Sequence, residues 1–190
     1  MKKPLYMTAE ERREVLREYG KKYDLNVFIE TGTSVGDTPW ELKDDFDVLY
    51  TIEVFKPVFR AAKERFKDEP KINPLFGDST TVLPWLLPQI KEPALVWLDG
   101  HYCGPGSGHG DLDTPVVQEL EIIFNDIQTS WLGHVILIDD ARIFKGQPEH
   151  EDEPHYADYP SCEWVQERAE AILWDFELKD DIMRLTPRDE

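Results

Sequence analysis

The sequence of 190 residues is poor in cysteine and lacks any long hydrophobic run. Its two cysteines, Cys103 and Cys162, are too few for a disulfide framework. No apolar stretch approaches the ~20 residues of a membrane-spanning helix. The N-terminus has two lysines but not the apolar core of a signal peptide. We therefore expect a cytoplasmic protein that does not enter a membrane.

Positive charge is also scarce, because 21 basic residues stand against 39 acidic ones and the net charge is −18 at pH 7. Nucleic acids and anionic membranes are polyanions, so this charge argues against either as a partner. The 41% hydrophobic and 12% aromatic content is typical of a packed globule. At ~150 residues per domain, the length favours a single domain over residues 1–190.

Apolar and amphipathic segments alternate along the chain. Buried strands are expected at residues 26–30, 47–53, 71–76, 93–99 and 134–140, helices at 8–20, 35–43, 56–67, 80–87, 113–131 and 159–173, and a terminal hairpin at 174–179 and 181–187. Thr8 and Glu11 have the spacing of a capping box, and Gly20 is expected to end the helix of the N-terminal region 1–25. This alternation predicts an α/β fold whose parallel sheet is covered by helices on both faces.

Two loops are expected between these elements. Residues 100–112 are rich in glycine and histidine, and residues 145–158 are polar and acidic. Ligands of open parallel sheets bind beyond the carboxyl ends of the strands. We therefore expect both loops to lie over the functional site.

Every parallel strand expected here ends in, or just before, an acidic residue. These residues are Glu30, Glu53, Asp78, Asp99 and the pair Asp139–Asp140. An acid at one strand end is ordinary, but acids at all five strand ends are hard to explain by solubility alone. They mark the carboxyl edge as the site of the chemistry.

The turn after the first strand, residues 30–38, contains Gly32 and Gly36 but not the dinucleotide fingerprint G-x-G-x-x-G. Glycines there let a ligand approach the backbone, although a tight turn without a ligand is an alternative. Glu53 ends the next strand, where an acid binds the ribose hydroxyls of adenosine in Rossmann-type sites. Together, the turn and Glu53 favour a nucleoside-containing cofactor.

The order of five motifs resembles that of class I S-adenosylmethionine (SAM)-dependent methyltransferases. The motifs are ETGTSVGDT, IEVF, FGDST, VWLDGHY and ILIDD, between residues 30 and 140. The chain is most similar to the metal-dependent O-methyltransferases, which include catechol-type and macrolide- or sugar-modifying enzymes. This resemblance implies a Rossmann-like, doubly wound sheet of seven strands in the order 3-2-1-4-5-7-6.

The resemblance also implies roles for individual residues. Residues expected at the cofactor are Glu30, Gly32, Thr33, Ser34, Gly36, Thr38, Glu53, Val54, Asp78, Ser79 and Asp99. Asp99, Asp139 and Asp140 correspond to the metal-binding acids of the family. Three neighbouring carboxylates repel one another unless protons or a cation intervene, and Mg²⁺ prefers oxygen ligands. We therefore expect Mg²⁺ at these acids.

One departure concerns the general base. Catechol-type members carry a lysine shortly after the acid of the fourth strand, and this chain has Gly100, His101 and Tyr102 there. His101 can replace the lysine because imidazole titrates near neutral pH, and Asp99 is the other candidate.

The expected function is Mg²⁺-assisted O-methylation of a small molecule with a sugar- or polyol-type hydroxyl. Two alternatives are a metal-dependent hydrolase using Asp99, His101, Asp139 and Asp140, and a catalytically silent cofactor-binding domain. The sequence leaves the oligomeric state open, a homodimer included.

Overall fold

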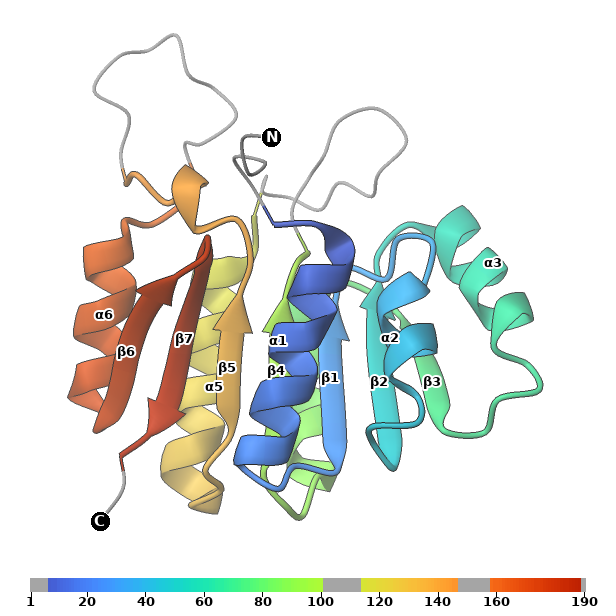
Figure 1. Ribbon diagram of the computed structural model, residues 1–190, viewed down its shortest axis with the longest axis horizontal. Helices are drawn as coiled ribbons and strands as arrows, with labels where there is room; N and C mark the ends of the chain where they lie inside the picture. Colours follow the sequence, from blue (N-terminus) through green and yellow to red (C-terminus); the bar gives the residue numbers. More distant parts are fainter. Residues whose placement is uncertain (1–6, 101–113, 147–157, 189–190) are drawn as a thin grey trace, which may run out of the picture.

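The computed structural model describes residues 7–100, 114–146 and 158–188, and its centre is one seven-stranded sheet (Figure 1). The strands are β1 (Val27–Thr31), β2 (Val48–Glu53), β3 (Ile72–Phe76), β4 (Ala94–Leu98), β5 (Val135–Ile138), β6 (Trp174–Lys179) and β7 (Ile182–Pro187). Their spatial order is β3-β2-β1-β4-β5-β7-β6, as the sequence predicted. The first five strands are parallel, whereas β7 is antiparallel to both β5 and β6.

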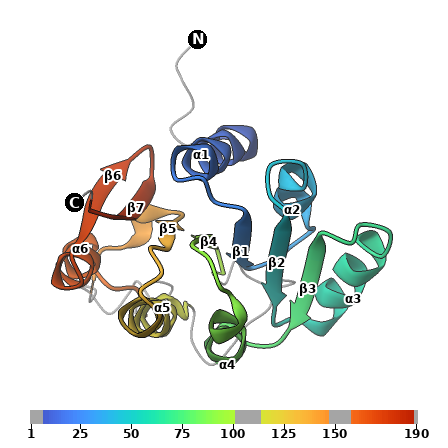
Figure 2. The ribbon, with the colours of Figure 1, turned by 90° about the horizontal axis from the view of Figure 1, so that it is seen from below.

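Six α-helices cover the two faces of this sheet (Figure 2). They are α1 (Ala9–Lys22), α2 (Asp37–Leu42), α3 (Lys56–Arg65), α4 (Ser79–Leu86), α5 (Val116–Ser130) and α6 (Cys162–Ala171), with short 3-10 turns η1 (Leu87–Gln89) and η2 (Ala141–Ile143). One hydrophobic cluster joins the sheet to α1, α2 and α3, and a second joins it to α4, α5 and α6. The expected covering of both faces is confirmed.

Side chains of the central strands alternate between these two clusters. In β1, Val27 and Ile29 pack toward α4–α6, while Phe28 packs toward α1–α3. In β4, Val96 and Trp97 divide in the same way. All of these side chains are buried, which explains why the strands are apolar throughout rather than alternating with polar residues.

The N-terminal helix begins as predicted but ends later. The Thr8 side chain accepts a hydrogen bond from the backbone N–H of Glu11, and the Glu11 carboxylate accepts one from the backbone N–H of Thr8. Gly20 was expected to end this helix, and that prediction is wrong, because α1 continues to Lys22. A Cβ atom on Gly20 would lie 2.8 Å from Cζ of Phe46, so this glycine allows the helix to pack closely on Phe46, two residues before β2.

Other differences from the sequence prediction concern the ends of elements. Helices expected at 113–131 and 159–173 are shorter, at 116–130 and 162–171. Most of the two expected loops, 100–112 and 145–158, lies outside the described residues. No helix among residues 7–100, 114–146 and 158–188 is long and apolar enough to span a membrane.

Candidate cofactor and catalytic site

The acidic residues predicted at the strand ends lie along the carboxyl edge of the sheet, which is at the top of Figure 1. They are Glu30, Glu53, Asp78, Asp99, Asp139 and Asp140. Asp99 and Asp139 directly follow β4 and β5. Their backbone N–H groups donate to the carbonyl oxygens of Thr31 (3.2 Å) and Leu98 (3.1 Å), respectively. The sheet therefore fixes both aspartates at neighbouring strand ends.

The turn between β1 and α2 requires glycine at two positions, which face different neighbours. Gly32 has φ +87°, and a Cβ there would lie 2.6 Å from the carbonyl oxygen of Asp99. Gly36 has φ +78°, and a Cβ there would lie 2.5 Å from Cζ of Phe66. Ser34 also has a left-handed backbone, at φ 49°. The turn is thus held close to β4 on one side and to α3 on the other.

Glu53 connects this turn to the end of β2. Its Oε2 accepts a hydrogen bond from the backbone N–H of Ser34 (3.2 Å), and its Oε1 accepts one from the N–H of Phe55 (2.8 Å). The residue is only 6% exposed. Each carboxylate oxygen retains a further lone pair, so both oxygens can still accept a ribose hydroxyl. The predicted pairing of the glycine turn with Glu53 is therefore present in the fold.

Glu30 lies at the inner end of a chain of hydroxyl groups. Thr51 Oγ1 donates to Glu30 Oε2 (2.7 Å), and Thr33 Oγ1 lies 2.6 Å from Thr51 Oγ1. Burial raises the pKa of Glu30 well above its usual value, while hydrogen bonds from Thr51 and Thr38 act in the opposite direction. Glu30, Thr33 and Thr38 thus come together as predicted, but Glu30 supports the turn from beneath.

A second polar group lies where α4 begins. Asp78 is the N-cap of α4 and accepts hydrogen bonds from the N–H (2.8 Å) and hydroxyl (2.6 Å) of Thr80. Ser79 and Glu119 of α5 are buried beside it. Burial raises the pKa of Glu119 to about 7. The side chains of Ser79 and Thr31 act on the pKa of Glu119 in the opposite direction. Neither Glu119 Oε1 nor Thr31 Oγ1 makes a hydrogen bond of good geometry among the described residues, so both remain open to a closer polar partner.

Arginine side chains contact the aspartates that follow β5. Arg12 Nε lies 3.0 Å from Oδ1 and 2.9 Å from Oδ2 of Asp139, and Arg12 Nη2 lies 3.4 Å from Oδ1 of Asp140. Arg142 Nη1 donates to the same Asp140 oxygen at 2.7 Å and also contacts Asp181 from the β6–β7 turn. Within the described residues, no group of three or more histidine, cysteine, aspartate or glutamate side chains is arranged to hold a metal ion.

Asp99 lies beside this group. In the described part of the chain, no arginine forms an ion pair with it. Burial raises the pKa of Asp99 to about 8, and the charges of Asp139 and Asp140 act in the same direction. Burial also raises the pKa of Asp139, to about 6, against the opposing charge of Arg12. His101, the other candidate base, lies outside the described residues.

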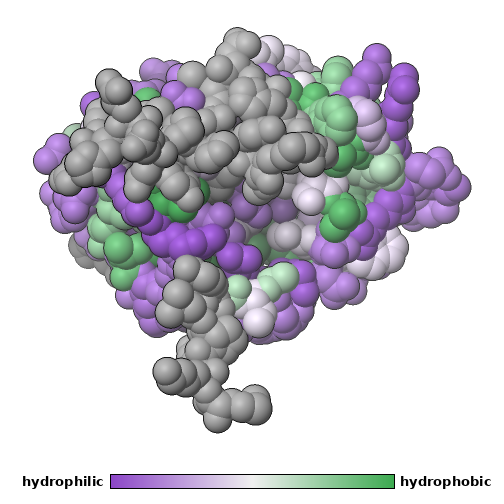
Figure 3. Space-filling view, turned by 90° about the horizontal axis from the view of Figure 1, so that it is seen from above, coloured by the Kyte–Doolittle hydropathy of each residue, from purple (hydrophilic) through white to green (hydrophobic). Residues whose placement is uncertain are grey.

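The side chains around Glu53 and β3 form an apolar area on the same edge. Val35, Val54, Phe55 and Phe76 are all at least partly exposed. Figure 3 shows hydrophobic side chains on the right of this edge, over the half of the sheet that contains β2, β3 and α3. Val54 therefore lies on an apolar surface next to Glu53, where the flat face of a purine base can pack.

Three residues of the site were missed by the sequence analysis, although each left a signal. Thr51 is a hydroxyl residue inside an apolar strand. Glu119 is one of two acids, with Asp126, on the mostly apolar buried stripe of α5, and Arg12 follows the N-cap Thr8 by one helical turn. A polar residue on a buried face requires a partner, and that requirement points to the site.

No protein-family model matches the sequence, and no curated protein matches it. Solved methyltransferase structures match the fold. The SAH-bound methyltransferase PaMTH1 of Podospora anserina has a TM-score of 0.63 and 13% identity, over 96% of this chain and 80% of that chain. The O-methyltransferase TomG of Streptomyces achromogenes, solved with SAM, has a TM-score of 0.61 and 15% identity, over 97% and 83%. A putative caffeoyl-CoA O-methyltransferase of Staphylococcus aureus has a TM-score of 0.60 and 11% identity, over 95% and 85%. The chain therefore has the fold of class I SAM-dependent methyltransferases.

Proposed function

We propose that this protein transfers a methyl group from SAM to a hydroxyl oxygen of a small molecule. The observation that carries the proposal is the bond from Ser34 N–H to Glu53, which joins the glycine turn to an acid placed for a ribose. The side chains around them fit the cofactor. Gly32 leaves no space for a Cβ, Val54 and Phe55 offer an apolar surface, and Glu119 has an unpartnered oxygen within the described residues.

The residues of this chain would divide the work as follows. Glu53 and the 31–36 turn would bind the ribose and methionine portions, and Asp78 and Ser79 would border the adenine. Bound SAM supplies an electrophilic methyl group on a sulfonium sulfur, and after transfer the remainder of the cofactor departs as a neutral thioether. Asp99 would accept the proton of the acceptor hydroxyl while the hydroxyl oxygen bonds to the methyl carbon. A base with a pKa of about 8 is suited to this step near neutral pH.

The nature of the acceptor is inferred from charge. A net charge of −18 disfavours nucleic acid, and the acidic carboxyl edge disfavours anionic small molecules. A neutral sugar- or polyol-type hydroxyl fits both constraints. The resemblance of the fold to TomG, an O-methyltransferase involved in tomaymycin synthesis, supports oxygen as the methyl acceptor.

Magnesium assistance and His101 stay predictions. Asp139 and Asp140, two of the three acids expected to bind Mg²⁺, are held by Arg12, so the described side chains do not fit the ion as they stand. The mechanism above therefore uses no metal. The hydrolase and the catalytically silent domain are distinguished from methyl transfer by the experiment below.

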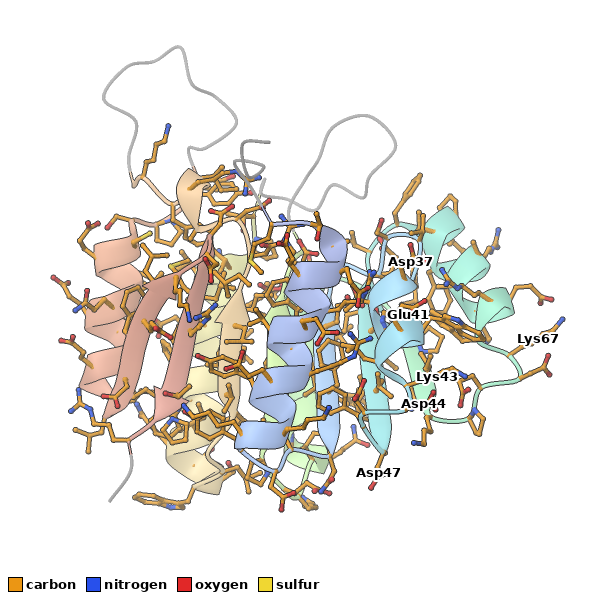
Figure 4. All side chains as sticks on the ribbon, viewed as in Figure 1. Asp37, Glu41, Lys43, Asp44, Asp47 and Lys67 are labelled. Atoms are coloured by element: carbon orange, nitrogen blue, oxygen red, sulfur yellow. The ribbon has the colours of Figure 1, made fainter. Side chains whose placement is uncertain are left out.

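Calorimetric titration of SAM into the full chain tests the proposal. We expect micromolar binding, and a loss of at least about tenfold in Glu53→Ala, because both the ribose contact and the support of Ser34 disappear. Asp47→Ala is the matched control, since Asp47 is an exposed acid at the opposite edge of the sheet (Figure 4). Turnover in an acceptor screen would then distinguish an enzyme from a silent binding domain. Absence of SAM binding by the wild-type protein would overturn the proposal and favour the hydrolase.

A further inference from the structure

We propose that the Arg12 guanidinium takes the charge-neutralising place predicted for a divalent cation at Asp139 and Asp140, so that the site works without Mg²⁺. Arg12 reaches both carboxylates, and its Nε lies within 3.0 Å of each oxygen of Asp139. The Asp139 side chain is 3% exposed and that of Arg12 is 25% exposed. Removing one partner of a contact so shielded from water leaves a buried charge without compensation, which is more destabilising than breaking a surface ion pair.

The position of Arg12 is set by the fold rather than by chance contact of a long side chain. The capping box at Thr8 fixes the start of α1, and the backbone N–H of Arg12 donates to Thr8 O at 3.1 Å. Buried Leu16, one turn later, anchors the helix in the core. The helix therefore starts beside the carboxyl edge, as Figure 1 shows, and presents Arg12 to it.

The other arginines of α1 have different partners. Arg13 bonds Glu10 of the same helix (2.7 Å), and Arg17 bonds Glu10, Glu14 and Asp45. Among these three arginines, Arg12 is the one that contacts the aspartates after β5 in the described structure. Arg13 thus provides a control on the same helix with the same chemistry.

The charges at this corner are shared between two arginines. The acids that face it are Asp99, Asp139, Asp140 and Asp181, and the bases are Arg12 and Arg142. Among the described residues, Asp139 has Arg12 as its only arginine partner, whereas Asp140 contacts both Arg12 and Arg142. Removing Arg12 would leave Asp139 buried beside two further carboxylates. Without the guanidinium these carboxylates would repel one another, and the side chains could then move to bind a divalent cation that relieves the repulsion.

A guanidinium differs from Mg²⁺ in its chemistry. It offers hydrogen-bond donors but no open coordination position for an acceptor hydroxyl. Arg12 would therefore balance the charge of Asp139 and Asp140 and hold them in place, and activation of the hydroxyl would fall to Asp99. Arg12 is thus a positioning residue of the proposed methyltransferase. Among the experiments below, only the SAM titration rests on that proposed function.

Thermal unfolding of wild type, Arg12→Gln and Arg13→Gln, each with excess MgCl₂ and with EDTA, tests the proposal. We expect the wild-type and Arg13→Gln midpoints to be equal in MgCl₂ and EDTA. Arg12→Gln should lose about 5 °C in EDTA and regain most of that loss in MgCl₂. Titration with Mn²⁺, followed by its electron paramagnetic resonance signal, should show binding in Arg12→Gln alone. Mn²⁺ binding by the wild type, or an Arg12→Gln midpoint that is insensitive to metal, would overturn the proposal.

Arg12→Lys keeps the proposal testable if Arg12→Gln does not fold. A lysine retains the positive charge, so this variant should stay insensitive to MgCl₂, and a midpoint that rises with MgCl₂ would count against the proposal. SAM titration in EDTA gives an independent measurement, and wild-type affinity should match that in MgCl₂. If SAM does not bind under either condition, the methyltransferase proposal fails, while the unfolding and Mn²⁺ measurements still decide the role of Arg12.

Discussion

The two halves of the carboxyl edge neutralise their acids by different means. The half formed by the ends of β1, β2 and β3, which we propose binds the cofactor and call the cofactor half, uses backbone N–H groups and hydroxyls, as Glu53 and Glu30 show. The half formed by the ends of β4 and β5 and the β6–β7 turn, which we propose binds the acceptor and call the acceptor half, uses arginines on Asp139 and Asp140. Backbone donors are fixed by the fold, whereas an arginine can exchange its partner.

This difference affects which substitutions each half tolerates. A cofactor that never changes is suited to a site whose donors are backbone groups, because only a change that moves the backbone can rearrange them. A variable acceptor is suited to a site built from long side chains, whose charges can be redistributed. Changes at the junction of the halves should therefore have the largest effects, and changes behind the cofactor half the smallest.

The largest effect is expected at Gly32, which lies between the halves. In Gly32→Ala the new Cβ would approach the Asp99 carbonyl to 2.6 Å, and φ +87° would be strained as well. We expect the free energy of unfolding to fall by about 2–4 kcal/mol and SAM affinity to fall at least about 100-fold. Urea unfolding and calorimetry measure both quantities.

Gly133→Ala is the matched control for this substitution. A Cβ on Gly133 would lie 3.5 Å from Pro187, an ordinary contact, so its stability should change by less than about 0.5 kcal/mol. Wild-type SAM affinity in Gly32→Ala would show that the turn does not hold the cofactor, and the division into two halves would then be wrong.

The next effect concerns Asp99, the proposed base of the acceptor half. Its pKa of about 8 lies above the usual value of 3.8, so the carboxylate form becomes dominant only above pH 8. Methyl transfer should therefore rise with pH and level off above about pH 8. Asp99→Asn should lower kcat by about 10²- to 10⁴-fold while the KM for SAM changes far less.

The stability of the same variant should move in the opposite direction. An acid whose pKa is raised on folding destabilises the native state as pH increases from its unfolded to its folded value. Asp99→Asn should therefore be more stable than wild type at pH 9 but not at pH 4. Asp44→Asn, an exposed aspartate labelled in Figure 4, should change neither kcat nor its pH profile. An unchanged kcat in Asp99→Asn would assign the base elsewhere, with His101 as the first candidate.

The sequence was sufficient for the succession of strands and helices, and the resemblance to class I methyltransferases supplied the order of the strands in the sheet. The glycine turn at Gly32 and the place of Glu53 at a strand end follow from local patterns, because apolar runs, glycines and strand ends are visible along the chain. The bond between Ser34 and Glu53 was not predicted, although adjacent parallel strands bring the two strand ends together.

The acceptor half could not be predicted in the same way. Arg12 and Asp139 are joined across 127 positions of the chain, and no local pattern links them. Arg12 lies one turn before Leu16, at the end of the buried face of α1, but the sequence does not show which of Arg12, Arg13 and Arg17 reaches these aspartates. Long-range ion pairs of this kind depend on how a helix rotates against the sheet, and the sequence alone does not determine that rotation.

The smallest effect is expected at Glu119, behind the cofactor half. Its pKa of about 7 lies above the usual 4.5, so wild-type stability should fall as pH rises from 4.5 to 7. Glu119→Gln removes this dependence and should gain roughly 1–3 kcal/mol at pH 8, with no gain at pH 4. Urea unfolding at the two pH values measures the difference, and Glu121→Gln, on the exposed side of α5, should show none. A Glu119→Gln variant that loses SAM affinity as it gains stability would show that the Glu119 carboxylate accepts a hydrogen bond from the cofactor. An equal loss of stability at both pH values would instead show that ionisation of the buried Glu119 does not lower the free energy of unfolding.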